Sequence, residues 1–150
     1  MTGLLYINET DVYDVYGAYL VEDREGDHKN YDSLMKSSAI KSHVAVSFRE
    51  ESGEKYPDEL VVTSEARDID LQFAIVAPNA AEFLQRYKDF ILFLKTGDHG
   101  WLRFRFPELN MVFRVFYKES TGYGQLTYFE EENEVAAKVK VKLREPNPSF

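Results

Sequence analysis

Asp68 and Asp70 are the residues whose types and spacing come closest to those of a catalytic pair. Two neighbouring carboxylates can act as general acid and general base when a cleft raises the pKa of one of them. Polar and apolar side chains alternate through residues 68–76, which predicts a strand with both aspartates on its wet face. Because no base, nucleophile or metal ligand stands beside them, we interpret them as solvated carboxylates that face cations on a neighbouring strand. A small hydrolase is the third of three functional hypotheses.

Other residues with chemical potential do not form a known constellation. His28, His43 and His99 are scattered, and none stands at ligand spacing from another. The chain has no cysteine, which excludes disulfides, thiolate metal ligands and cysteine nucleophiles. The Gly-Tyr-Gly segment at residues 122–124 matches neither a phosphate-binding loop nor a nucleophile elbow, and it predicts a break in a strand. We therefore expect no metal, no cofactor and no enzymatic activity.

Charged residues are distributed unevenly along the chain. The 150 residues include 26 acidic and 18 basic side chains, a formal net charge of −8, which argues against generic nucleic-acid binding; we expect no sequence-specific nucleic-acid partner either. Two clusters of opposite sign stand close to the C-terminus. The acidic tip consists of Glu130, Glu131, Glu132 and Glu134, and the basic stripe consists of Lys138, Lys140, Lys142 and Arg144.

The basic stripe is open to three interpretations. It is an ordinary solvent face that discourages edge pairing, a subunit contact that receives the acidic tip of another copy, or a track for a polyanion beside Trp101, Arg103 and Arg105. The acidic tip and the basic stripe are complementary between copies, and this complementarity favours self-assembly.

The elements that position these residues follow from hydropathy. Asn79 and Glu82 are typical of a helix start and Gly97 of a helix stop, so we expect a helix over residues 79–96. Leu92 falls on its polar side and should be exposed. About eight strands at hairpin spacing surround this helix, at residues that include 12–20, 44–48, 60–63, 68–76, 111–120 and 135–143; residues 22–33 should form a long surface loop. This pattern predicts a single domain over residues 1–150 that is mainly β (α+β), an antiparallel β-sandwich or split barrel with one flanking helix.

The sequence gives no sign of a membrane span or a secretory signal. The longest apolar run is the five residues 90–94, whereas a span needs about 20. The first residues lack a charged segment followed by a long apolar one. We expect the protein to be made and kept in a bacterial cytoplasm unless an assembly carries it out.

Several segments taken together resemble small tail proteins of tailed bacteriophages and prophages, especially the N-terminal domains of distal tail proteins and the related tail-tube proteins. The segments are Leu5-Tyr6-Ile7-Asn8, Val15-Tyr16-Gly17-Ala18, Leu34-Met35-Lys36, the strand over residues 68–73, the helix with Phe83, Leu84 and Tyr87, the hairpin around residues 107–109, and residues 141–148. The resemblance implies a β-sandwich or split-barrel core assembled as a ring, typically hexameric, with other tail proteins as partners and the virion tail as location.

The preferred hypothesis is therefore a non-enzymatic structural subunit of a phage or prophage tail. Its expected subunit interface comprises Leu92, the acidic tip and the basic stripe. The alternative is a carbohydrate- or peptide-binding β-sandwich module, in which Trp101, Tyr123 and Tyr128 form an aromatic platform.

Overall fold

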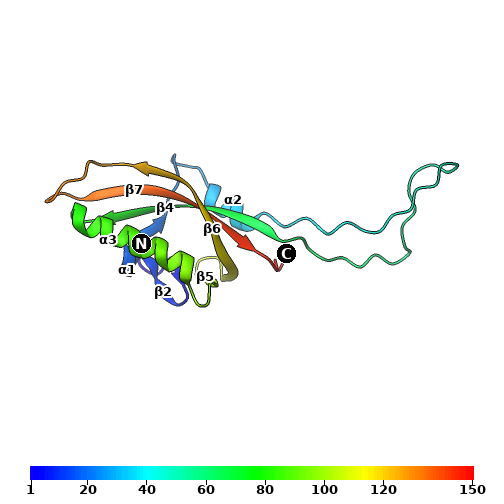
Figure 1. Ribbon diagram of the computed structural model, residues 1–150, viewed down its shortest axis with the longest axis horizontal. Coiled ribbons are helices and arrows are strands. Elements are labelled where there is room, and N and C mark those ends of the chain that lie inside the picture. Colours follow the sequence, from blue (N-terminus) through cyan, green and yellow to red (C-terminus); the bar gives the residue numbers. More distant parts are fainter.

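The computed structural model describes residues 1–150 and contains seven strands and three helices. In chain order the elements are β1 (Tyr6–Ile7), β2 (Thr10–Asp11), α1 (Val12–Tyr16), β3 (Ala18–Leu20), α2 (Lys29–Met35), β4 (Arg67–Ala77), α3 (Ala80–Thr96), β5 (Leu102–Phe106), β6 (Met111–Gln125) and β7 (Val135–Glu145). The predicted mainly β character is confirmed (Figure 1). None of the helices has the length and hydropathy needed to cross a membrane.

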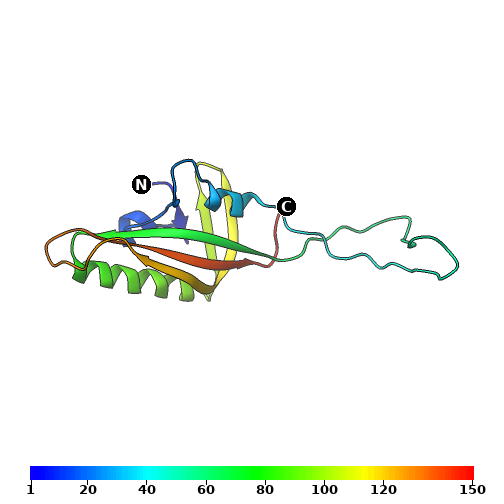
Figure 2. The same cartoon turned by 90° about the horizontal axis from the view of Figure 1, so that it is seen from above.

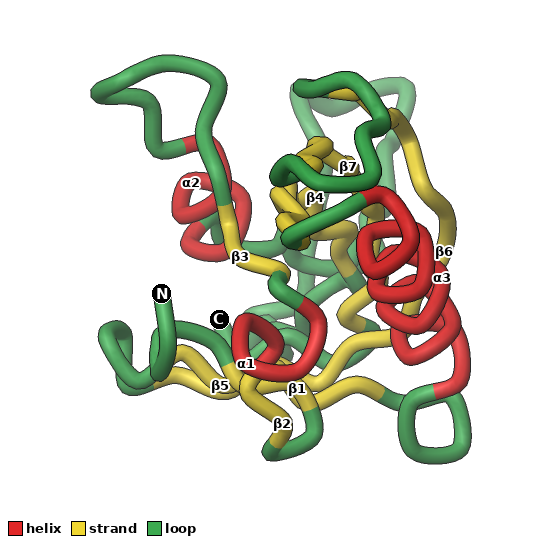
Figure 3. Tube along the Cα trace, turned by 90° about the vertical axis from the view of Figure 1, so that its left-hand side faces the viewer, coloured by secondary structure: helices red, strands yellow, loops and turns green.

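The seven strands form one antiparallel sheet in the order β2-β1-β5-β6-β7-β4-β3. β6 connects its two parts, because residues 111–115 pair with β5 and residues 116–125 pair with β7. Register irregularities after Tyr117 and Ser120 occur in the half that pairs with β7, and such irregularities increase local twist. The sheet thus curls into a half-barrel, which confirms the predicted split barrel (Figure 3). The break predicted at residues 122–124 is wrong, because β6 continues through them.

The longest ladder joins β4 and β7 over eleven residue pairs, from Arg67 opposite Glu145 to Ala77 opposite Val135. Large apolar side chains recur at every second residue of both strands and put one apolar face on the core, so a slip of one residue would move that face toward solvent. Asp68 and Asp70 lie on the other face, as predicted. The larger apolar side chains buried along the ladder are Ile69, Leu71, Phe73, Ile75, Val135, Val139, Val141 and Leu143.

The helix predicted over residues 79–96 is confirmed as α3, which lies along the sheet and packs on β4, β6 and β7 (Figure 2). The Asn79 side chain accepts a hydrogen bond from the Glu82 N–H at 2.9 Å, and Gly97 ends the helix. Phe90 packs edge-to-face on Phe73 of β4, with ring centroids 5.2 Å apart. Leu92 is 59% exposed, as predicted.

The strand predicted over residues 12–20 is wrong, since its first part is α1 and only its last part is β3. Asp11 accepts hydrogen bonds from the N–H groups of Tyr13 and Asp14 at 3.1 and 3.4 Å, and this N-cap begins a helix despite the β-forming Val and Tyr that follow. Gly17 ends α1 in the left-handed conformation (φ 64°), and the chain then turns back into the sheet.

The prediction of a surface loop over residues 22–33 is wrong in its second half, because α2 begins at Lys29. α2 lies beside an edge of β4 that no strand covers. Asn30 accepts a hydrogen bond from the Gln72 N–H at 2.8 Å, and Ser33 accepts one from the Asp70 N–H at 2.9 Å. Side chains of a helix thus occupy backbone donors that would otherwise be free to pair with another strand.

The half-buried strand predicted at residues 44–48 and the short strand predicted at residues 60–63 do not form. Both belong to a long excursion, residues 37–66, that leaves the body of the molecule (Figures 1 and 2). Isolated bridges join Ile40 to Ser64 and Val46 to Lys55, so the two limbs of the excursion run side by side. We refer to residues 37–66 as the arm.

Substitution of Gly17 tests the tight junction between α1 and β3. A Cβ at this position would lie 2.4 Å from the Val76 carbonyl oxygen, whereas a Cβ at Gly26, also at positive φ, would meet nothing within 4 Å. We expect Gly26→Ala to lower the free energy of unfolding by about 1 kcal/mol and Gly17→Ala by about 1–3 kcal/mol more, because the backbone must shift. Urea unfolding measures both, and equal losses would contradict the contact.

Candidate functional site

The arm is the longest segment of the structure without a buried side chain. No residue from 37 to 66 is buried. Eight large hydrophobic side chains in it are each 47–81% exposed: Ile40, Val44, Val46, Phe48, Tyr56, Leu60, Val61 and Val62. Scattered single hydrophobic residues are normal on a surface, but eight on one extended segment make the arm the candidate site of contact with another molecule.

The root of the arm is fixed by a buried ion pair. Arg67, the first residue of β4, donates from Nε to Glu145 Oε1 at 3.1 Å, and the two side chains are only 8% and 6% exposed. The guanidinium also donates to the Lys36 carbonyl at the end of α2. It stacks against Phe150 at 5.0 Å from the ring centroid, and the Phe150 carbonyl accepts from Ser38. Both limbs of the arm therefore leave from a rigid point.

Asp68, one of the two candidate catalytic carboxylates, is held by two cations. Arg144 lies 3.0 Å and Lys118 3.3 Å from its carboxylate oxygens. The hydrogen bond from Arg144, followed by that from Lys118, lowers the pKa of Asp68 below its ordinary value. Asp68 is therefore ionised at neutral pH. These contacts fit the interpretation of carboxylates paired across a wet face, since a general acid needs the opposite shift.

The basic stripe lies along the same wet face, on β7. Lys138 pairs with Asp23 at 3.2 Å and Arg144 pairs with Asp68, whereas Lys140 and Lys142 have no carboxylate within ion-pair distance. The acidic tip lies in the connection between β6 and β7, and none of its glutamates pairs with the stripe within the molecule. Two cations of the stripe are thus free for another partner.

The three aromatic residues of the alternative hypothesis are not brought together. Trp101 follows the C-terminal end of α3, where its ring lies 5.7 Å from that of Phe116. Tyr123 lies beside Tyr87 in the N-terminal half of α3, with ring centroids 5.4 Å apart. Tyr128 is 87% exposed in the connection between β6 and β7. Trp101 and Tyr123 thus contact different aromatic residues, one beyond the end of α3 and one near its middle, and no ring contact joins the three residues into one platform.

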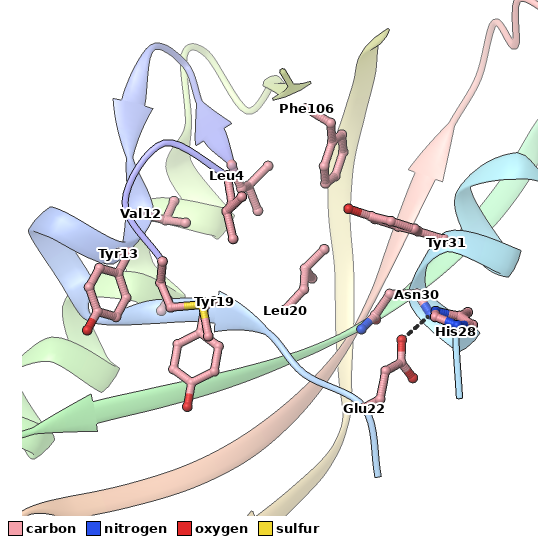
Figure 4. A pocket seen from close by; sticks show the side chains of 13 residues that line it. Leu4, Val12, Tyr13, Tyr19, Leu20, Glu22, His28, Asn30, Tyr31 and Phe106 are labelled. Carbon is pink, nitrogen blue, oxygen red and sulfur yellow. Dashed lines mark hydrogen bonds between the residues drawn. The ribbon is translucent and has the colours of Figure 1, made fainter. Parts of the chain in front are cut away.

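A mainly apolar cavity of about 190 Å³ lies between the N-terminal residues, α1, β3 and α2 (Figure 4). Its polar lining is largely partnered within the protein. The Glu22 carboxylate accepts from the Asn30 N–H at 2.9 Å, and the Tyr31 hydroxyl donates to Glu108 at 2.6 Å. Burial, and after it this hydrogen bond, raises the pKa of Tyr31 to about 12. No three His, Asp or Glu side chains converge here or elsewhere to hold a metal ion. No local sequence pattern indicates this cavity, because its lining comes from separate segments of the chain.

Comparison with known proteins identifies the fold. No protein-family model matches the sequence, and no match was found among the curated proteins. Among solved structures, the chain is similar to the Dit protein (gp 19.1) of SPP1, described as a paradigm of the hub adsorption apparatus in phages that infect Gram-positive bacteria. The resemblance to distal tail proteins is confirmed at the level of the fold. The TM-score is 0.59 at 11% sequence identity, over 94% of this chain and 48% of the Dit chain, so this chain spans about half the length of Dit.

Removal of Glu145 tests the root of the arm. We expect Glu145→Ala to lower the free energy of unfolding by about 3–5 kcal/mol, because it leaves the Arg67 guanidinium buried without its counter-charge. Asp68→Ala is the matched control, since it also removes a carboxylate from an arginine contact but from a pair that is 31–38% exposed. Its expected loss is below about 1 kcal/mol. Denaturant unfolding measures both, and similar losses would show that the buried pair does not fix the root.

Proposed function

We propose that the protein is a structural subunit of a bacteriophage or prophage tail, and that copies of it assemble into a ring at the distal end of the tail. The fold supports this role, because nearly the whole chain matches half of a phage hub protein. A distal position rather than a tube position follows the description of that neighbour as part of the adsorption apparatus.

The arm is the single observation on which the proposal of self-assembly rests. Its hydrophobic side chains remain about half exposed or more in the fold of their own chain. Burial of apolar area against another molecule contributes a free energy of roughly 25 cal/mol per Å², before the cost of association is subtracted. A second copy is the partner that is always present where the protein is made. The arm therefore acts as a strap that lies on the neighbouring subunit.

The length of the arm suits this task. Each limb has about 15 residues and spans about 50 Å when extended at about 3.3 Å per residue. A compact body of about 120 residues has a radius of gyration of about 14 Å. The arm can therefore cross a whole neighbouring body, and it projects away from its own (Figure 1).

Removal of the arm tests this proposal. The Glu65 N–H donates to the Ala39 carbonyl at 2.7 Å, so a two-residue Asn-Gly turn can replace residues 40–64 without moving β4. We expect the full chain to form rings in electron micrographs and to sediment as an oligomer at about 100 μM, and the armless variant to sediment as a folded monomer. A full chain that is strictly monomeric at this concentration and modest salt contradicts the proposal, as does an armless variant that assembles normally.

The exposed Leu92 and the contact between acidic tip and basic stripe belong to the same proposed interface. Lys140 and Lys142 support the contact because they have no partner within the molecule. We expect Lys140→Glu to weaken assembly and a second change, Glu131→Lys, to restore it, as measured by sedimentation. If neither single reversal alters assembly, the stripe is an ordinary solvent face.

A further inference from the structure

Three arginines share the outward face of β5 and β6 in an arrangement that the fold does not need. Arg103 lies directly opposite Arg114 in the ladder, and Arg105 lies opposite Val112. Like charges directly opposite one another destabilise a sheet. Such a pair becomes favourable when an anion lies between the two side chains.

Two of these arginines are held in place by aromatic rings. The Arg114 guanidinium lies 3.7 Å from the centroid of Trp101, and that of Arg105 lies 4.1 Å from the centroid of Tyr6. A guanidinium stacked on a ring still presents its N–H groups sideways, in the fork geometry that binds a carboxylate through two hydrogen bonds. The positions of the donors are thus set before a ligand arrives. We refer to Tyr6, Trp101, Arg103, Arg105, Val112 and Arg114 as the arginine face.

The carboxylates near the arginine face do not neutralise it. Glu9 pairs with Arg103 at 2.8 Å and with Arg105 at 3.2 Å, so one charge is shared between two cations. Asp98 lines the same open hollow, but His99 at 3.6 Å is the partner within ion-pair distance of it. Arg114 has no carboxylate within that distance. The face therefore keeps at least one unpaired, preorganised guanidinium beside exposed apolar surface.

The far end of the arm has the complementary composition. Residues 49–59 carry five carboxylates, Glu50, Glu51, Glu54, Asp58 and Glu59, against two cations, Arg49 and Lys55. Lys55 is already paired with Glu51 at 2.8 Å. Phe48 and Tyr56 are both about half exposed and stand at the same end. We refer to residues 48–59 as the arm end.

We propose that the arm end of one copy docks on the arginine face of a neighbouring copy. Its carboxylates would lie between Arg103 and Arg114, and its aromatic side chains would cover Trp101 and Val112. Charge complementarity between two surfaces of one sequence favours a second copy over a nucleic acid, since a chain of net charge −8 repels a polyanion. This inference rests on the proposed self-assembly and names the surface on which the arm lies.

Charge reversal in the full chain tests the docking. We expect Arg114→Glu to raise the concentration needed for half-maximal assembly at least tenfold, measured by sedimentation at about 0.15 M salt. Arg24→Glu, before α2, is the matched control, since it makes the same substitution at an exposed arginine outside the proposed interfaces, and it should shift that concentration less than twofold. Adding Glu50→Lys and Glu59→Lys to Arg114→Glu should recover most of the loss, because the two surfaces are then complementary again. Circular dichroism checks that each variant is folded.

The outcomes separate this inference from the proposed function. If the unaltered chain assembles and Arg114→Glu assembles equally well, the docking surface is wrong while self-assembly stands. If Arg114→Glu weakens assembly but the arm-end reversals restore nothing, the arginine face binds something other than the arm end, and the inference is again wrong. An unaltered chain that stays monomeric overturns both proposals.

Discussion

The buried pair of Arg67 and Glu145 is the contact on which the rest of the structure depends. It joins the first residue of β4 to the last residue of β7, and the eleven-pair ladder that carries 11 of the 24 buried hydrophobic residues begins there. Two charges out of water are favourable only when hydrogen bonds satisfy them. Here the end of α2 supplies a further acceptor, while the Arg67 Nη2 is buried without a partner. The same point sets the register of the central strands and the direction of the arm.

The reliable parts of the sequence prediction were those in which local signals agreed with one another. β7 and β4 alternate without interruption, and α3 has both a cap and a stop, so each was found with nearly correct bounds. The prediction of a strand at residues 12–20 is wrong because the N-cap at Asp11 outweighs the β propensity of several Val and Tyr residues. Propensity is a weak prior wherever hydrogen bonds at a cap decide the conformation.

The arm was not predicted, and the arginine face was predicted only in part, through Trp101, Arg103 and Arg105. Alternation at residues 44–48 indicates only that one face will be covered, and it does not say whether the cover comes from the same chain. Arg103 and Arg114 stand far apart in sequence, and only the register of β5 and β6 makes them neighbours. By contrast Leu92 was found, because helical periodicity fixes a direction within one element. Surfaces that the fold leaves exposed are thus visible in sequence only where periodicity within one element fixes the direction of a side chain.

The exposed arm also makes the unassembled subunit vulnerable. Its segments around Val44 and Val61 combine high β propensity with few charges, which is the composition of chains that stack into aggregates. The carboxylates between them act as gatekeepers, since they repel an identical arm that approaches in register. An extended segment with few backbone hydrogen bonds is also readily cut by proteases. If copies assemble as proposed, the lifetime of a subunit in the cell depends on how soon the arm is covered by a neighbour.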